Sequence, residues 1–253
     1  MNDLEINIIP CLNDNYAYII SFENQALVID PSESLPIIKF IEKNNLNLKY
    51  ILNTHHHFDH VGGNLDLKKK YNASVIGSKK DKNRIPGIDL LLSENEEFIF
   101  NGYIFKVIEV PGHTLGHIAF YLESKKAVFT GDTIFSLGCG KLFEGTSKQM
   151  WDSICKIRAL PRDTQIYCGH EYTLNNALFT QSIKNDNKIE KKIKEVEGLR
   201  KNNLPSIPTT VSEEIKLNLF FQADNNKIKS LFSNNKITSE ETFALIRSAK
   251  DSY

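Results

Sequence analysis

Seven histidines are the side chains of this 253-residue sequence with the clearest capacity for chemistry. Four of them fall in one run, Thr54-His55-His56-His57-Phe58-Asp59-His60. Because side chains alternate along an extended loop, we expect His55 and His57 to point the same way and the histidine between them to point elsewhere. Asp59 and His60 follow where the loop turns toward the next expected helix. One short segment can therefore offer two ligands to one metal ion and two to a second.

Three further polar loops each follow an apolar run that is typical of a strand. They are Pro111-Gly112-His113-Thr114, Thr130-Gly131-Asp132-Thr133 and Cys168-Gly169-His170-Glu171. Taken alone, each is an ordinary glycine-containing turn. Together they indicate a site, because all follow the carboxyl end of a strand, where the sites of layered α/β folds gather.

The candidate ligands divide into two sets with a shared carboxylate. One metal ion can be bound by His55, His57 and His113, and a second by Asp59, His60 and His170, with Asp132 as the candidate bridge. Five neutral imidazoles and two carboxylates suit zinc, with iron or manganese as alternatives. Two divalent ions, two carboxylates and one hydroxide sum to a charge of about +1, which favours an anionic substrate.

Other residues near these loops have no place in the two ligand sets. His56 and His117 are left over, and we interpret His117 as a supporting or structural residue. Asp30, at the end of an expected strand, could accept the second N–H of a ligand imidazole. The pair Gly62-Gly63 permits the backbone to approach closely beside the histidine run.

The elements that must position these loops predict a mixed α/β fold followed by helices. Strands are expected at Leu4–Ile9, Tyr16–Ser21, Ala26–Ile29, Tyr50–Asn53, Ser74–Gly77, Glu97–Phe100, Tyr103–Val110, His117–Leu122, Ala127–Thr130 and Gln165–Cys168. Helices are expected at Leu35–Lys43, Val61–Tyr71, Ser147–Leu160, Lys184–Lys201 and Thr238–Lys250, the last capped by Thr238 or Ser239. The segment Asn203–Thr210, with two prolines, should interrupt helical structure. We therefore predict an α/β domain over residues 1–171 and a smaller helical domain over residues 172–253.

Charge and composition argue against several classes of partner. Lys plus Arg (31) equals Asp plus Glu (31), so no global charge favours nucleic acid or an anionic membrane. The acidic start lacks the layout of a secretory signal, and no apolar run reaches the roughly 20 residues of a membrane span. We expect a cytoplasmic monomer whose cysteines, Cys11, Cys139, Cys155 and Cys168, are reduced.

Four motifs in order, THxHxDH, GHT, GDT and a late GH, resemble those of the metallo-β-lactamase superfamily over roughly residues 5–172. The resemblance implies an αββα sandwich with a dinuclear metal site at one edge. Further segments resemble glyoxalase II, the hydroxyacylglutathione hydrolase family, which carries a smaller C-terminal helical domain. These segments are Asp14-Asn15-Tyr16, the run from Gly138 to Gly145, Gly169-His170-Glu171-Tyr172-Thr173 and Arg247-Ser248-Ala249-Lys250-Asp251.

The glyoxalase II resemblance implies hydrolysis of S-D-lactoylglutathione, and of related S-2-hydroxyacylglutathiones, to D-lactate and glutathione. It places glutathione contacts at Lys141, Phe143, Tyr172, Arg247 and Lys250. Arg247 and Lys250 are three residues apart, so on a helix they share a face and could bind a carboxylate of glutathione together with Lys141. The family often has tyrosine where this chain has Phe143, so a hydroxyl contact to glutathione is missing here.

The expected mechanism is attack on the thioester carbonyl by a hydroxide held between the two metal ions. Asp59 would orient this hydroxide while binding one metal, and Asp132 would bridge both. Alternatives within the superfamily are a β-lactamase, a persulfide dioxygenase, an RNA-processing nuclease or another hydrolase. An alternative of another class is a non-catalytic protein that binds metal or glutathione.

Overall fold

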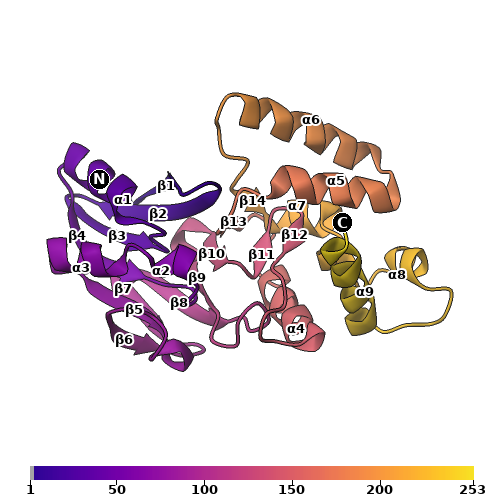
Figure 1. Cartoon of the computed structure of the whole chain (residues 1–253), viewed down its shortest axis with the longest axis horizontal. Coiled ribbons are helices and arrows are strands. Elements are labelled where there is room, and N and C mark those ends of the chain that lie inside the picture. Colours follow the sequence, from indigo (N-terminus) through magenta and orange to yellow (C-terminus); the bar gives the residue numbers. More distant parts are fainter. Residues whose placement is uncertain (1–2) are drawn as a thin grey trace. The chain divides into compact units, whose positions relative to one another are not determined.

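The computed structural model of the chain describes residues 3–253 (Figure 1). It divides into two compact units, of which the first comprises Met1–Glu109 and Gly116–Lys125. The second comprises Val110–Leu115 and Lys126–Tyr253. Neither unit begins or ends at residue 171 or 172. The expected domain boundary between these two residues stays a prediction.

The first unit contains a six-stranded sheet in the order β1-β2-β3-β4-β5-β6. Its strands are β1 (Glu5–Cys11), β2 (Asn15–Phe22), β3 (Gln25–Ile29), β4 (Asn47–Leu52), β5 (Ser74–Ser78) and β6 (Ile88–Leu92). The strands β1 to β3 pair antiparallel, and β3 to β6 pair parallel. Parallel neighbours need crossover connections, and the helices α1 (Ser34–Lys43) and α3 (Asn64–Tyr71) lie in two of them.

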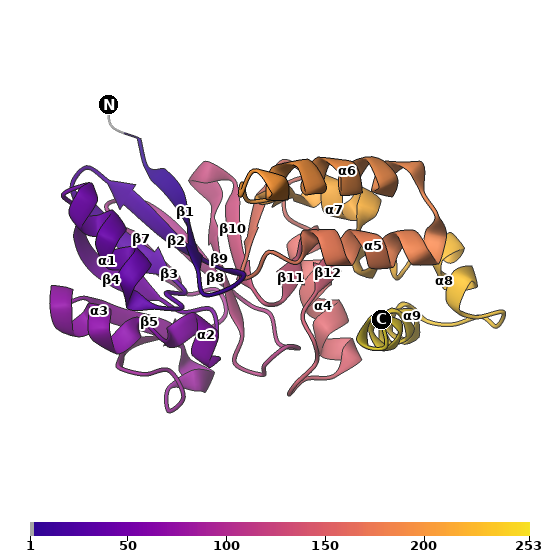
Figure 2. The same ribbon diagram turned by 45° about the horizontal axis from the view of Figure 1, so that its top comes forward.

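The helices α1 and α3 cover one face of this sheet (Figure 1, Figure 2). Ile37 and Ile41 of α1 and Leu67 of α3 share a buried cluster with strand residues such as Ile19 and Val28. The first unit also contains an antiparallel meander in the order β9-β8-β7. Its strands are β7 (Glu97–Phe100), β8 (Tyr103–Glu109) and β9 (Ile118–Leu122), and short 3-10 turns occupy η1 (Lys79–Asp81) and η2 (Glu123–Lys125).

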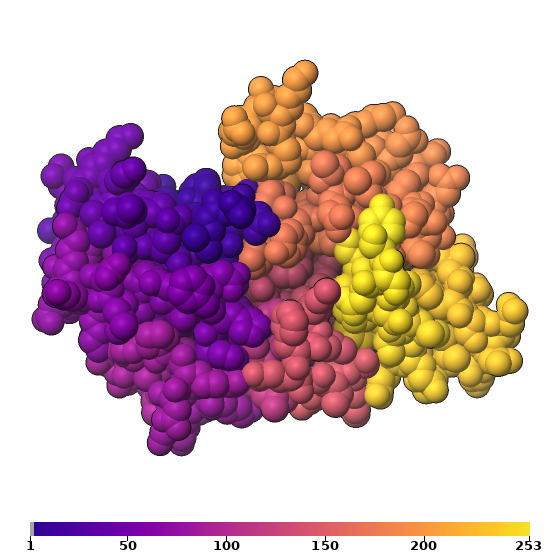
Figure 3. Space-filling view, viewed as in Figure 1, coloured from indigo at the N-terminus to yellow at the C-terminus, as the bar shows by residue number. Residues whose placement is uncertain are grey.

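The second unit combines a few short strands with most of the helices. β10 (Ala127–Gly131) pairs parallel with β13 (Gln165–Cys168), β13 pairs antiparallel with β14 (Thr209–Thr210), and β11 (Ile134–Phe135) forms a hairpin with β12 (Gly138–Cys139). The helices are α4 (Ser147–Arg158), α5 (Thr173–Lys184), α6 (Asn187–Lys201), α7 (Val211–Leu217), α8 (Asn226–Phe232) and α9 (Ser239–Asp251), with the 3-10 turn η3 (Phe220–Gln222). α5 and α6 lie side by side, and α9 leaves one face at the surface (Figure 2, Figure 3).

Most expected elements are confirmed, with differences at the histidine run and among the C-terminal helices. The run was expected to be a loop, but Asp59 and His60 lie in a short helix, α2 (Phe58–Val61). The helix expected at Val61–Tyr71 is accordingly wrong at its start, since α3 begins only at Asn64. A side chain on Gly62 would place its Cβ 2.4 Å from the Ser32 carbonyl oxygen, so the backbone does approach closely at this break.

The expected C-terminal helices also need one correction. The helix expected at Lys184–Lys201 begins three residues later, as α6 at Asn187, and α5 (Thr173–Lys184) before it is not among the expected helices. Asn185 between them is left-handed, with φ of 40°. Thr238 caps α9 in a capping box with Glu241, as expected. No helix of the described residues is both long enough and apolar enough to cross a bilayer.

Candidate metal centre

The histidine run leaves the carboxyl end of β4, and Asp30 fixes its first residues. The Thr54 backbone N–H donates to Oδ1 of Asp30 at 2.8 Å, and the Thr54 hydroxyl donates to Oδ2 at 2.6 Å. The oxygen of Thr54 lies 3.1 Å from Nδ1 of His55. Because the hydroxyl hydrogen is directed at Asp30, Thr54 accepts from His55, and Nε2 of that imidazole keeps its lone pair.

Asp30 orients His60 in the same way. Its Oδ2 lies 3.0 Å from Nδ1 of His60, and both side chains are buried. A carboxylate at Nδ1 holds the proton there and leaves Nε2 as the ligand atom. The expected contact between Asp30 and an imidazole is therefore present. Both Asp30 oxygens already accept hydrogen bonds from protein groups, so Asp30 is placed to orient the histidines.

Asp59 is held by an asparagine that lies 44 residues earlier in the sequence. The side-chain amide of Asn15 donates to both the backbone oxygen and Oδ2 of Asp59, each at 3.0 Å. Asn15 is buried, whereas Asp59 is partly exposed. Oδ2 of Asp59 lies 3.6 Å from Nε2 of His60. The Asn15 amide thus fixes the rotamer of Asp59, a candidate ligand that lies beside the candidate ligand His60.

The two left-over histidines do not belong to the candidate ligand groups. Nδ1 of His56 lies 3.3 Å from Oδ2 of the buried Asp81, which also accepts from Nε of Arg84 at 3.1 Å. The ring of His117 stacks on His55 with centroids 4.5 Å apart and an interplanar angle of 15°. His56 is therefore turned away from the candidate site, and His117 supports the ring of His55.

The second unit contributes His113, Asp132 and His170, all buried. Oδ2 of Asp132 lies 3.5 Å from Nε2 of His113 and 3.3 Å from Nε2 of His170. Nδ1 of His113 lies 2.9 Å from the Lys141 carbonyl oxygen, which again directs Nε2 toward the carboxylate. One oxygen of Asp132 thus faces an imidazole of each expected ligand group, which is compatible with the expected bridging role of this carboxylate.

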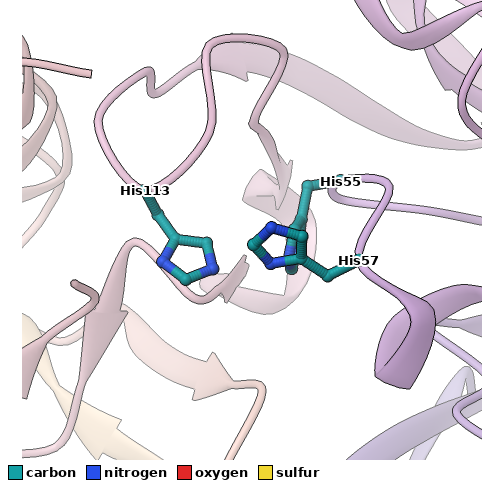
Figure 4. A group of neighbouring side chains, drawn as sticks. All are labelled: His55, His57 and His113. Carbon is teal, nitrogen blue, oxygen red and sulfur yellow. The ribbon is translucent and has the colours of Figure 1, made fainter. Parts of the chain in front are cut away.

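Three groups of side chains have ligand atoms that all lie within 4.8 Å of one another. They are His55, His57 and His113; Asp59, His60 and His170; and Asp30, His55 and His60. Figure 4 shows the rings of the first group turned toward one another. The first two groups have the composition expected for the two metal sites. Imidazole nitrogens together with carboxylate oxygens are a donor set that fits divalent zinc, iron or manganese.

Two of the candidate substrate contacts lie against the candidate ligands. The ring of Phe143, 64% exposed, meets His113 edge-on with centroids 5.2 Å apart. The ring of Tyr172 stacks on His170 at 4.7 Å with an interplanar angle of 6°. Lys141 is exposed, and its backbone holds His113. These positions are open to a substrate while they contact the imidazoles.

The two C-terminal cations have different environments. Arg247 is only 6% exposed and donates from Nη1 to the Cys139 carbonyl oxygen at 2.9 Å, with Nη2 3.0 Å from Asp251. Its Nε has no hydrogen-bond partner among the described residues. Lys250 is half-buried and donates to the Asn175 carbonyl oxygen at 3.2 Å. Burial, with a smaller contribution from Arg247, lowers the pKa of Lys250 to about 8. Their expected role in binding glutathione stays a prediction.

The four cysteines are free thiols, as expected. Burial raises the pKa of Cys11 and of Cys168 to about 12. Burial also raises the pKa of Cys139 to about 11, although the nearby Arg247 opposes the shift. A thiol of such high pKa is a weak nucleophile at neutral pH, so the candidate chemistry does not depend on the cysteines.

Comparison with known families agrees with these motifs. Residues 12–170 match the metallo-beta-lactamase superfamily, and residues 171–253 match the hydroxyacylglutathione hydrolase C-terminus. A hydroxyacylglutathione hydrolase of Pelagibacter ubique is 50% identical over 253 residues, covering 99% of this chain and 100% of the relative. One of Methylococcus capsulatus is 41% identical, covering 98% of each.

Solved structures establish the fold. ETHE1 from Myxococcus xanthus superposes with a TM-score of 0.66 at 21% identity and covers 99% of each chain. The BLEG-1 B3 metallo-beta-lactamase has a TM-score of 0.66 at 22% identity and covers 85% of this chain and 98% of its own. The expected metallo-β-lactamase fold with a C-terminal helical part is therefore confirmed.

Proposed function

Because this chain belongs to the hydroxyacylglutathione hydrolases of the metallo-β-lactamase superfamily, and is a thioester hydrolase, we propose that it works with two metal ions bound by the ligand groups described above. The first ion would be held by His55, His57 and His113, the second by Asp59, His60 and His170, and Asp132 would be a ligand shared by both. Zinc suits this donor set best, and iron or manganese could replace it.

One observation carries the proposal: ligand atoms of the expected composition lie within 4.8 Å of one another in both groups. Their orientation supports it, because His55, His60 and His113 each have an acceptor at Nδ1. A surface cluster of histidines would not need three separate acceptors that all leave Nε2 as the ligand atom.

When bound, the two ions lower the pKa of water and polarise the thioester carbonyl, which is the chemistry that they supply. The side chains of the chain do the positioning. Asp59, held by Asn15, accepts a hydrogen bond from the attacking water and orients it toward the carbonyl. Asp132, whose Oδ2 faces Nε2 of His113 and of His170, would be the carboxylate shared by the two ligand groups.

The substrate of this site is S-D-lactoylglutathione or a related S-2-hydroxyacylglutathione. Glutathione carries two carboxylates, so the cations Lys141, Arg247 and Lys250 complement its charge, and the rings of Phe143 and Tyr172 flank the thioester end. The missing hydroxyl at Phe143 removes one polar contact. We further propose that the protein acts as a monomer in the cytoplasm, binds no nucleic acid, and has its domain boundary at residues 171 and 172.

Metal analysis paired with a thioester assay tests the proposal. Purified protein should contain about two metal equivalents and hydrolyse S-D-lactoylglutathione, and both should be lost with a chelator. His57→Ala should lose at least one equivalent, whereas the matched control His56→Ala, whose ring faces Asp81, should keep both. Turnover that survives complete metal removal, or a single bound ion in active protein, would contradict the proposal.

A further inference from the structure

The hairpin Ile134–Cys139 is held by four side chains from three segments of the C-terminal region: α5, α7 with the residue that ends it, and α9. Four successive residues of the hairpin each have one backbone group bonded in this way. Asn176 Nδ2 donates to the Ser136 oxygen at 3.1 Å, Glu214 Oε2 accepts from the Leu137 N–H at 2.9 Å, Asn218 Nδ2 donates to the Gly138 oxygen at 3.0 Å, and Arg247 Nη1 donates to the Cys139 oxygen at 2.9 Å. All four side chains are buried. We call this set the hairpin clasp.

Glu214 is the centre of the clasp. Its side chain has no solvent exposure, and its Oε2 accepts from Asn218 at 2.8 Å as well as from Leu137. Its Oε1 accepts from the hydroxyl of Thr209 at 2.7 Å. Leu137 has a φ of 58°, which a non-glycine residue adopts only when its surroundings hold it there. A buried carboxylate is unfavourable in an apolar core, and this one is satisfied by fixing the hairpin.

The clasp lies directly before the segment that the proposed function assigns to glutathione. Lys141 follows Cys139 by two residues, and its carbonyl oxygen accepts from His113 at 2.9 Å. Between them, a Cβ on Gly140 would lie 2.0 Å from the Asp132 carbonyl oxygen. The backbone at Gly140 is therefore closely packed just before Lys141, and the clasp fixes the hairpin residues that precede it.

We propose that Glu214 is a positioning residue for substrate binding, which fixes the hairpin Ile134–Cys139 and so places Lys141 and Phe143 against glutathione. The inference rests on the proposed function of Lys141 and Phe143. Glu214 touches neither substrate nor metal ligand, and it acts through the Leu137 N–H and through Asn218.

Two substitutions of Glu214 separate positioning from simple loss of charge. Glu214→Ala should raise both the KM for S-D-lactoylglutathione and the Kd of free glutathione, measured by calorimetry, by roughly tenfold, since small displacements far from the chemistry are costly. Its metal content should not change, and its kcat should fall less than its KM rises. Glu214→Gln should restore both constants, because its carbonyl oxygen can accept from Leu137 and Asn218 while its amide donates to Thr209.

Two controls make the result decisive. Val196→Ala, a buried change in α6, should leave KM and glutathione affinity unchanged. Lys141→Ala should weaken glutathione binding, and adding Glu214→Ala should then have a smaller effect than it has alone. If Glu214→Ala does not fold, Asn218→Ala removes the bond to Gly138 and should show the same rise in KM.

The possible failures can be told apart. If Lys141→Ala weakens glutathione binding and neither Glu214→Ala nor Asn218→Ala does, the positioning role is wrong and the proposed function stands. The same conclusion follows if Val196→Ala raises KM equally, or if Glu214→Gln fails to restore it. If Lys141→Ala itself leaves glutathione affinity unchanged, the proposed glutathione contact is wrong, and the inference that depends on it is wrong too.

Discussion

Three of the candidate histidine ligands of this chain are each oriented by a residue that is not itself a candidate ligand. Asp30 orients His60, Thr54 orients His55, and the Lys141 carbonyl orients His113. Such partners fix the tautomer and the direction of the imidazole, so they contribute to metal affinity although they never touch the ion. The capacity of each of these histidines to bind metal therefore depends on its hydrogen-bond partner as well as on its own side chain.

Asn15 provides the sharpest test at this scale, because both hydrogens of its amide go to Asp59. Asn15→Ala should lower the affinity of the second metal site by about 10- to 100-fold, since Asp59 loses the contacts that hold its rotamer. Titration of the metal-free protein with zinc, followed by calorimetry, measures this directly. The matched control is Asn7→Ala in β1, because the side-chain amide of Asn7 donates to no group in the described part of the chain. Equal zinc affinity in both variants would rule out a role for Asn15.

The sequence alone predicted the candidate ligands but not the residues that orient most of them. The ligands stand in short motifs at the ends of apolar runs, and such motifs can be recognised locally. Asn15 lies 44 residues from Asp59, and Glu214 lies 77 residues from Leu137. Contacts between residues so far apart in the sequence follow no spacing rule. In the sequence, Asn15 stands out only as part of the motif Asp14-Asn15-Tyr16. Asp30 was found because it ends a strand beside the site.

At the scale of elements, the strand ends place the polar loops, and glycines let these loops approach one another. Gly140 is the tightest case, because a Cβ there would lie 2.0 Å from the Asp132 carbonyl oxygen and 3.0 Å from Nδ1 of His113. The backbone of Gly140 also donates to the Thr133 oxygen at 3.3 Å. No side chain fits without displacing the loop that carries Asp132.

Gly140→Ala should therefore destabilise the protein by about 1–3 kcal/mol and reduce its metal content. Gly198→Ala is the matched control, since nothing lies within 4 Å of a Cβ at that position of α6. This control should gain up to about 1 kcal/mol from helix propensity and keep its metal. Chemical denaturation and metal analysis of the two variants give the comparison, and an unchanged metal content in Gly140→Ala would contradict the argument.

The elements predicted from sequence were those with a clear apolar period. β7 and β13 have the expected bounds, and most other expected strands differ by one to three residues at an end. The strand β6 (Ile88–Leu92), the two-residue strands and α7 and α8 are too short to show a period, so the sequence does not predict them. The longer helix α5 (Thr173–Lys184) is not predicted either, because its apolar residues show no clear helical period. The helix α2 is not predicted because it has only four residues, and two of them, Asp59 and His60, are candidate ligands in a run that is interpreted as a loop.

At the scale of the whole molecule, the numbers of acidic and basic residues are equal, but one acidic residue, Glu214, lies where its charged form is unfavourable. Glu214 is fully buried, and this burial raises its pKa from 4.5 to about 7, although Thr209, Asn218 and the Leu137 N–H partly oppose the rise. The folded protein thus holds the Glu214 proton more tightly than the unfolded chain does. The contribution of Glu214 to the free energy of unfolding is therefore undiminished below pH 4.5 and declines as the pH rises toward 7.

Glu214→Gln removes this titration while keeping the shape of the side chain, so its stability relative to the natural protein should increase between pH 5 and pH 8. A tenfold change in proton affinity is worth about 1.4 kcal/mol, so the increase should be on the order of 3 kcal/mol at most. Denaturant unfolding of both proteins at pH 5 and at pH 8 measures this increase. At each pH, the difference in the free energy of unfolding between Glu214→Gln and the natural protein cancels any change in metal binding that the two proteins share. The exposed Glu190→Gln in α6, whose carboxylate pairs with Lys194, should show no such increase. A constant difference between Glu214→Gln and the natural protein from pH 5 to pH 8 would mean that the carboxyl of Glu214 keeps one protonation state across this range.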